Sequence, residues 1–125
     1  MRYDTRKKLT INHTEVEKIV TVALNGRLDI ETVPEAEKYL VQVTQQRPGA
    51  HVIFDLSQLD YISSFGLSLL LAMRKELRRS SAELVLAQVQ PFVAQVLEIA
   101  GLDQELKPYE TLSQAIEALQ KKDRT

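Results

Sequence analysis

The sequence contains no cysteine, and its 16 basic residues nearly cancel its 17 acidic ones, which leaves a formal net charge of -1. The absence of cysteine excludes a disulfide scaffold, a thiolate nucleophile and any zinc or iron–sulfur site built from thiolates. The two histidines, His13 and His51, are too few and too far apart in the sequence for a recognisable metal-binding motif. We therefore expect neither a metal ion nor a cofactor.

A basic surplus and a long apolar run are also missing. A protein that wraps nucleic acid needs surplus Lys and Arg to displace counterions from the phosphates, and this chain has no such surplus. No window reaches the roughly 20 apolar residues that a membrane-spanning helix requires. The N-terminus reads Met-Arg-Tyr-Asp-Thr-Arg-Lys-Lys and is not followed by the apolar segment of a secretory signal. We expect a cytoplasmic protein that neither inserts into a membrane nor binds nucleic acid.

The sequence does have the composition of an ordinary globular domain. Hydrophobic residues make up 44% and charged residues 26% of its 125 residues, so there is enough apolar surface to offset the entropy that the chain loses on folding. A chain of this length fits one domain. We predict a single domain over residues 1–125, with a core at residues 8–120 and a short flexible tail from Lys121 to Thr125.

Short β-branched runs alternate with amphipathic stretches along the chain. The expected strands are residues 9–11, 19–24, 51–56 and 84–89, with a weaker one at residues 106–108. The first two form a hairpin with its turn at Thr14-Glu15, and Asn25-Gly26 ends the second strand. Strands that alternate with helices indicate an α/β layer fold with right-handed crossovers.

Four helices are expected between and after these strands. Their N-terminal signals are Thr32 with Glu35, Ser63-Ser64, Pro91, and Thr111 with Gln114. In the first of them, we expect the Thr32 hydroxyl to accept a hydrogen bond from the Glu35 backbone N–H. The helix that opens at Pro91 is expected to end at Gly101.

No catalytic motif assembles from the polar residues. The phosphate-binding patterns Gly-x-x-x-x-Gly-Lys-Ser/Thr and Gly-x-Gly-x-x-Gly are absent from the sequence. Gly66-Leu67-Ser68 begins like a nucleophile elbow, but Leu70 replaces the second glycine and no histidine is placed to activate Ser68. The remaining candidate carboxylates read as turn and strand-end residues: Asp29, Asp55 and Asp60. We predict a protein that is not an enzyme and has no catalytic residue.

The segment from Asp55 to Leu71, read as strand, loop and helix N-terminus, carries the functional hypothesis. Functional sites of α/β sheets gather at the carboxyl ends of the strands, and a helix N-terminus offers unpaired backbone N–H groups. A serine at that position tolerates phosphorylation, which adds about -1.5 to -2 charges at neutral pH. From the residues alone, Ser63 or Ser64 either caps the helix or carries a phosphate that switches binding.

A family resemblance bears on this choice. The stretch Leu59-Asp60-Tyr61-Ile62-Ser63-Ser64-Phe65-Gly66-Leu67 resembles the signature of STAS domains, specifically the single-domain anti-sigma factor antagonists (anti-anti-sigma factors) of bacteria. Gly26-Arg27-Leu28-Asp29 is similar to the Gly-x-Leu-Asp turn of that family, and residues 84–102 are similar to its strand–helix–Gly-Leu tail. The resemblance covers residues 8–120 and implies a STAS-like α/β fold, with a mixed sheet of four to five strands and about four helices packed on it.

The resemblance also implies a set of site residues. Ser64 matches the phosphorylated serine, Asp29 the acidic residue beside it, and Gly66 the glycine that permits close approach of the backbone. The expected partner-binding surface consists of Asp29, Ser63, Ser64, Phe65, Gly66 and Ser68. Ser63 stands where many members have Asp, and Phe65 stands where they usually have Ser, Thr or Ala. Phe65 is either an anchor for a partner or buried against the sheet.

The function that the resemblance implies is a phosphorylation-switched binding module in signal transduction and transcription regulation. Unphosphorylated, it would bind an anti-sigma factor that is also a serine kinase of the histidine-kinase-like ATPase type, and so release a sigma factor or another output. Phosphorylation of Ser64 would weaken that complex, and a metal-dependent serine phosphatase would restore it. The alternative is a STAS scaffold subunit of a larger signalling or transport assembly, which is not phosphorylated.

Overall fold

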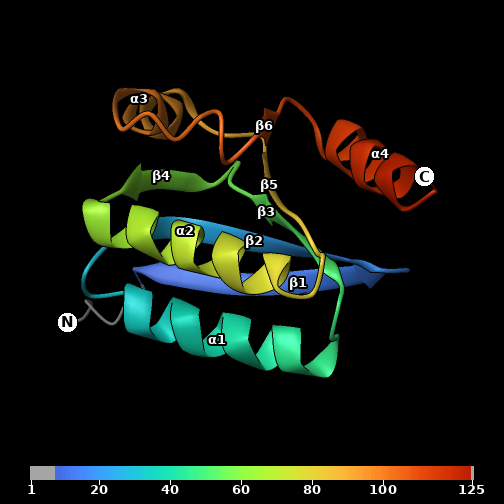
Figure 1. Ribbon diagram of the computed structural model, residues 1–125. Coiled ribbons are helices and arrows are strands. Elements are labelled where there is room, and N and C mark those ends of the chain that lie inside the picture. Colours follow the sequence, from blue (N-terminus) through green and yellow to red (C-terminus); the bar gives the residue numbers. More distant parts are fainter. Residues whose placement is uncertain (1–7, 125) are drawn as a thin grey trace.

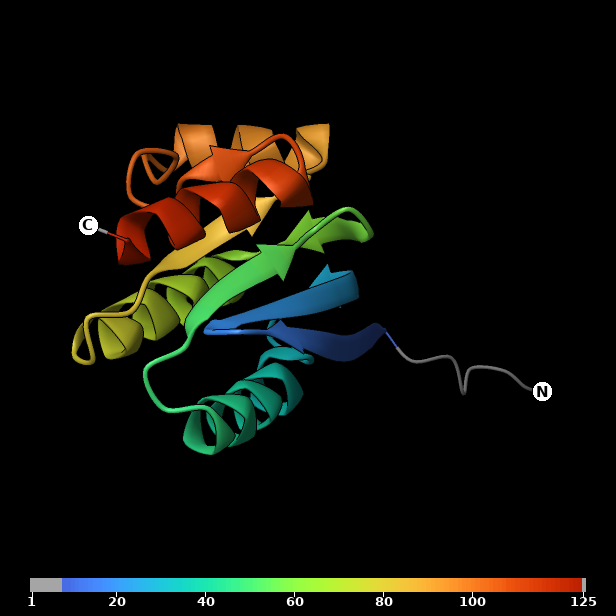
Figure 2. The same cartoon turned by 90° about the vertical axis from the view of Figure 1, so that its right-hand side faces the viewer.

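A six-stranded mixed sheet lies between two helical layers in the computed structural model, which describes residues 8–124 (Figure 1, Figure 2). The strands are β1 (Leu9–Val16), β2 (Ile19–Leu28), β3 (His51–Asp55), β4 (Leu59–Ile62), β5 (Leu84–Ala87) and β6 (Pro108–Tyr109). The helices are α1 (Val33–Gln46), α2 (Ser64–Arg78), α3 (Pro91–Ile99) and α4 (Leu112–Asp123). The predicted α/β fold with four helices is confirmed, and the sheet has six strands where four to five were expected. The N-terminal segment in which we expect no secretory signal lies, apart from its last residue, outside the described residues.

The central strand is β2, which pairs with three other strands. The sheet order is β1-β2-β3-β5-β6; β1 runs antiparallel to β2, and β3, β5 and β6 continue the sheet in parallel. The first half of β2 pairs with β3, and its last residues, Gly26 to Leu28, pair with β4. The sequence did not predict β4.

Two expected turns are wrong, and both corrections concern the hairpin. β1 runs on to Val16, so the turn lies at Glu17-Lys18 instead of Thr14-Glu15. β2 does not end at Asn25-Gly26, because pairing with β4 extends it to Leu28. Gly26 has φ +119°, and a Cβ atom there would lie 2.3 Å from the carbonyl oxygen of Lys8. Glycine is therefore required by close packing inside the strand.

The helices cover both faces of the sheet (Figure 2). On one face α1 and α2 bury apolar side chains against the strands, including Leu40 and Val43 of α1 and Leu70 of α2. On the other face Ala115 and Leu119 of α4 form a smaller apolar cluster with strand residues. Each fully buried Leu or Phe contributes about 1.5–3 kcal/mol to folding. None of the helices in the described part of the chain is long and apolar enough to cross a membrane.

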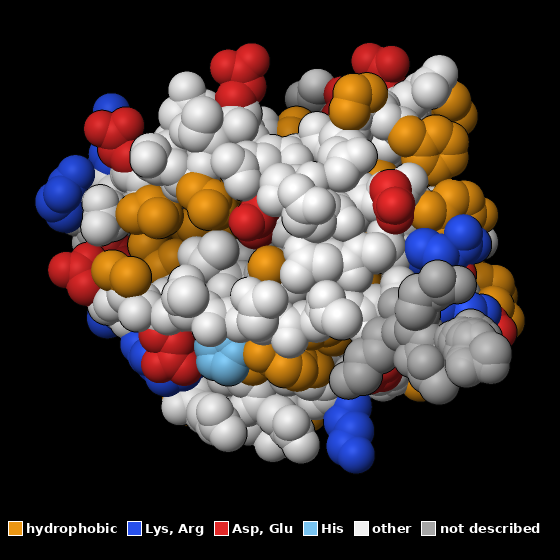
Figure 3. Space-filling view, turned by 180° about the vertical axis from the view of Figure 1, so that it is seen from behind, with side chains coloured by type: hydrophobic (Ala, Val, Ile, Leu, Met, Phe, Trp, Pro, Cys, Tyr) orange, Lys and Arg blue, Asp and Glu red, His pale blue; other side chains and the backbone are white. Residues whose placement is uncertain are grey.

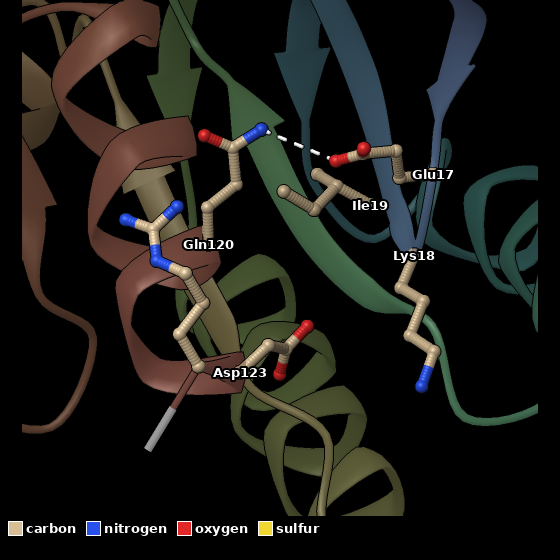
Figure 4. Close-up of a pocket in the computed structure, with 6 residues that line it drawn as sticks. Glu17, Lys18, Ile19, Gln120 and Asp123 are labelled. Carbon is tan, nitrogen blue, oxygen red and sulfur yellow. Dashed lines mark hydrogen bonds between the residues drawn. The ribbon is translucent and has the colours of Figure 1, made fainter.

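The C-terminal helix is held to the sheet by polar contacts at its end. The Glu83 backbone N–H donates to Nδ1 of His51 (3.0 Å), so Nε2 of this buried ring carries the hydrogen that it donates to Oδ1 of Asp123 (2.8 Å). This hydrogen bond from His51 lowers the pKa of Asp123. One turn earlier in α4, the Gln120 side-chain amide donates a hydrogen bond to the Glu17 carboxylate across a shallow pocket (Figure 4). The expected tail from Lys121 therefore begins inside α4, which ends at Asp123.

Candidate functional site

Ser63 and Ser64 have different roles at the start of α2. Ser63 is the N-cap residue, with an extended backbone, and its hydroxyl oxygen accepts hydrogen bonds from the backbone N–H groups of Phe65 (3.2 Å) and Gly66 (3.4 Å). Ser64 is the first helical residue and is exposed. Within residues 8–124 its hydroxyl has no hydrogen-bond partner. Ser63 therefore caps the helix, and the adjacent Ser64 has an exposed hydroxyl that is not used for capping.

This division predicts unequal effects of removing the two hydroxyls. Ser63→Ala should lower the free energy of unfolding by about 1 kcal/mol, because the helix loses its cap. Ser64→Ala should change it by less than about 0.5 kcal/mol, since an exposed hydroxyl without a partner is removed. Urea unfolding of both variants, followed by circular dichroism, measures the difference. Equal losses in the two variants would show that Ser64 shares the capping role.

The segment that joins β4 to α2 and bears Ser63 and Ser64, here called the serine loop, packs closely on the end of β2. The Ser63 N–H donates to the Leu28 carbonyl oxygen (3.0 Å). Gly66 is buried one turn later, and a Cβ atom at this position would lie 2.7 Å from that same carbonyl oxygen and 2.7 Å from Cγ1 of Ile62. A side chain at residue 66 would push α2 away from the strands, so the close approach expected of Gly66 is present in the structure.

Asp29 follows Leu28 directly in the chain. The hydrogen bond from the Ser63 N–H to the Leu28 carbonyl therefore also brings Asp29 close to the serine loop. Its carboxylate is buried, with 8% of the residue exposed, and accepts hydrogen bonds from the backbone N–H groups of Glu31 (3.0 Å) and Thr32 (3.2 Å). Nε of Arg27 lies 3.3 Å from the other carboxylate oxygen. Burial raises the pKa of Asp29, but the hydrogen bonds from Glu31, Arg27 and Thr32 outweigh it, and the net shift is downward.

The same contacts correct one expectation about α1. Thr32 precedes the helix as predicted, but its hydroxyl makes no capping hydrogen bond to Glu35. Instead it donates to the Arg27 carbonyl oxygen (2.9 Å) and accepts from the Asp29 backbone N–H (2.9 Å). The predicted capping box at Thr32 is wrong because Asp29 and Thr32 satisfy each other within the loop.

The lowered pKa of Asp29 predicts acid sensitivity. A carboxyl group whose pKa is lower in the folded than in the unfolded protein stabilises the fold above its usual pKa near 4, and this contribution is lost as the pH falls through the folded-state value. Asp29→Asn should therefore be less stable than the parent at pH 7, and the gap should narrow as the pH falls below about 4. Urea unfolding at several pH values tests this. A gap that stays constant down to pH 2.5 would contradict the assignment.

Aromatic and apolar side chains lie on the segments that adjoin the two serines, namely β4, the start of α2 and the residues after β2. Phe65 is 52% exposed and Ile30 is 61% exposed, so the alternative that Phe65 is buried against the sheet is excluded. The guanidinium of Arg27 lies 4.6 Å from the ring centre of Tyr61, which stacks on Phe92 of α3 with ring centres 5.9 Å apart. In Figure 3, hydrophobic side chains gather along the right-hand margin, the side on which α3, β4 and the start of α2 lie.

The structure thus brings most of the predicted site residues to one surface. Ser63, Ser64 and Phe65 are adjacent at the start of α2, and Ser68 is exposed one turn later. The sequence did not single out Arg27, Tyr61 or Phe92, because no periodicity links residues on β2, β4 and α3. Within residues 8–124, no group of three or more His, Asp or Glu side chains is arranged to hold a metal ion.

Comparison with known proteins identifies the class to which this fold and site belong. The family model of the STAS domain matches residues 10–115. BtrV of Bordetella bronchiseptica, named as an anti-sigma factor antagonist, is 34% identical over 94 residues, which are 75% of this chain and 78% of BtrV. The chain therefore belongs to the STAS domain family, and its relatives include anti-sigma factor antagonists. These relatives are named for binding-type regulation, as anti-sigma factor antagonists, in agreement with the prediction that the chain is not an enzyme.

Solved structures share the same fold. A protein from Thermotoga maritima, described as an anti-sigma factor antagonist, superposes with a TM-score of 0.82 at 24% identity, covering 88% of this chain and 94% of that one. SpoIIAA has been solved unphosphorylated (TM-score 0.77, 22% identity, 89% and 96% coverage). The phosphorylated form of SpoIIAA from Bacillus gives a TM-score of 0.67 at 23% identity, with 87% and 98% coverage.

Proposed function

We propose that this chain is an anti-sigma factor antagonist whose binding is switched off by phosphorylation of Ser64. The observation that carries the proposal is the separation of the two serine roles. Ser63 caps α2, and the Ser64 hydroxyl is exposed and has no hydrogen-bond partner within residues 8–124. Phosphorylation would therefore break no hydrogen bond of the fold, and the helix N-terminus would tolerate the added charge.

The charges around Ser64 explain why phosphate would change binding. The lowered pKa keeps Asp29 ionised at neutral pH, and Arg27 offsets its charge. The surface offered to a partner then includes the exposed apolar side chain of Phe65, next to the uncharged hydroxyl of Ser64. A phosphate would add about -1.5 to -2 charges to it. A partner that covered this charge without a matching cation would bury it unpaired, which is strongly unfavourable.

The partner that we propose is an anti-sigma factor that is also a serine kinase of the histidine-kinase-like ATPase type. It would bind the unphosphorylated chain, release a sigma factor or another output, and then phosphorylate Ser64 from its own ATP. A metal-dependent serine phosphatase would restore binding. The contact surface would comprise Ser63, Ser64, Phe65 and Ser68, with Asp29 and Gly66 holding the loop beneath it. The names of the relatives, and the two forms in which SpoIIAA has been solved, support this proposal.

A phosphorylation assay tests the proposal directly. The protein would be incubated with its cognate kinase and ATP, and the phosphate would be located by mass spectrometry. We expect modification of Ser64 in the parent and in Ser63→Ala, and none in Ser64→Ala. Phosphate on another residue, or no phosphate at all, would reject the assignment of Ser64.

A further inference from the structure

We infer a second binding site, for a small organic dianion, between the C-terminal half of α2, the start of β5 and α4. A hollow of about 300 Å³ lies there, lined among others by Arg74 and Arg78 of α2, Leu84 of β5, Lys107 before β6, and Lys122 of α4. This volume is at the lower end of the range for small-molecule sites. Ser64 opens α2 and Arg78 ends it, about 20 Å away along the helix axis, so the site is separate from the proposed phosphorylation site.

The floor of this hollow is an open edge of the sheet. On one side β5 pairs with β3, and the hydrogen bonds of that ladder use alternate residues, because the Val52 N–H bonds to Glu83 and the Leu56 N–H bonds to Ala87. Leu84 therefore directs its N–H and carbonyl to the opposite side. There β6 covers only Leu86 and Ala87, and within residues 8–124 no hydrogen bond joins Leu84 to this side.

A buried backbone donor without a partner is unfavourable, and most such groups in proteins are paired. Leu84 is 2% exposed and lies against the hollow. Its amide is therefore ready to donate to an oxygen atom of a ligand, and its carbonyl is ready to accept from a ligand hydroxyl group.

The charges around this floor favour an anion. Four cationic side chains line the hollow against two carboxylates, those of Glu83 and Glu105. Both carboxylates are already engaged, Glu105 with Arg74 (3.7 Å) and Glu83 with Lys122 (3.4 Å). Within the described residues, Arg78 and Lys107 form no ion pair. Two cations thus remain for a ligand, which matches a charge of -2.

The ligand class that fits these groups is a small hydroxylated dianion, either a dicarboxylate or a phosphate monoester. Arg78 and Lys107 would bind its charged oxygens, the Leu84 amide would donate to one of them, and the Leu84 carbonyl would accept from its hydroxyl. Monoanions would bind more weakly because they engage only one of the two cations.

Nuclear magnetic resonance titration of the full-length ¹⁵N-labelled chain tests the inference at low ionic strength. Malate and glycerol 3-phosphate are the two dianion probes and distinguish the two sources of charge, and acetate is the monoanion control. We expect a saturable shift of the Leu84 amide resonance with at least one dianion and a weak, unsaturated response to acetate. An unmoved Leu84 resonance, or shifts spread evenly over all lysines and arginines, would overturn the site.

Matched variants separate a built site from general attraction to positive charge. Arg78→Ala and Lys107→Ala should each raise the dissociation constant about tenfold, because each removes one charged hydrogen bond. Lys75→Ala removes the same charge from an exposed position of α2 that does not line the hollow. Its dissociation constant should stay within about twofold of that of the parent. Equal weakening by Lys75→Ala and Arg78→Ala would show non-specific binding and reject the proposal.

Discussion

Replacing Ser64 with aspartate is expected to weaken binding to the proposed kinase partner about 30-fold or more, whereas Ser64→Ala should keep the affinity within about twofold. Ser64 is exposed between Ser63 and Phe65, at the centre of the surface that we propose the partner covers. A carboxylate at this position would be buried without a counter-charge in the complex, and each 1.4 kcal/mol of penalty reduces the affinity tenfold. Isothermal titration calorimetry with the purified kinase measures both constants.

The chain offers a matched control for this experiment. Ser113 is also an exposed serine in the first turn of a helix. This helix is α4, which packs on the face of the sheet opposite to α1 and α2. Ser113→Asp adds the same charge in the same helical context and should leave the affinity unchanged. If Ser64→Asp binds as tightly as the parent, or if Ser113→Asp weakens binding equally, a local switch at Ser64 is contradicted.

Replacing Gly66 with alanine should lower the free energy of unfolding by about 2–3 kcal/mol. In most helical positions this substitution is favourable by about 1 kcal/mol, because alanine has the higher helix propensity. At Gly66 the added methyl group would meet the Leu28 carbonyl oxygen and the Ile62 side chain, both at 2.7 Å. The carbonyl belongs to the backbone and also accepts from the Ser63 N–H, so it has little freedom to move. Urea denaturation measures the loss.

Gly49 provides the comparison for Gly66. It has φ +81°, and no atom lies within 4 Å of a Cβ placed there. Gly49→Ala should therefore lower the free energy of unfolding by about 1 kcal/mol through backbone strain alone, without a steric clash. Gly66 has no positive φ, so its substitution causes a steric clash instead of backbone strain. The loss of unfolding free energy in Gly66→Ala should be clearly larger than in Gly49→Ala. A Gly66→Ala variant as stable as the parent would show that α2 shifts freely, and the close packing of the serine loop on β2 would lose its proposed importance.

Much of the fold could be predicted because local signals and tertiary structure agree. Thr111 caps α4 and accepts from the Gln114 N–H at 3.1 Å, as the capping box predicts. Pro91 opens α3, and Gly101 follows its end with φ +74°. Each of these signals acts on backbone groups within about four residues of its own position, so the sequence alone carries it.

The features that were missed depend on contacts between distant segments. β4 has only four residues, and its partner is the end of β2, more than 30 residues earlier, so it reads as a loop in the sequence. Thr32 lost its expected capping bond because Asp29 competes for its hydroxyl. The stacking of Tyr61 on Phe92 joins β4 to α3 across 31 residues. No periodic pattern within one element reports such pairs.

The position of the serine loop on β2 has a consequence for recognition. β2 pairs with β1 on one side and with β3, followed by β4, on the other, so each of its residues has a neighbouring strand on at least one side. The loop that bears the serines follows β4 directly and is hydrogen-bonded to the end of β2, which pairs with three strands of the described sheet. Such a surface has little conformational freedom left to lose when another protein closes over it. In the mechanism that we propose, association and release would require no refolding of this chain and would depend on whether one oxygen atom, that of the Ser64 hydroxyl, carries a phosphate.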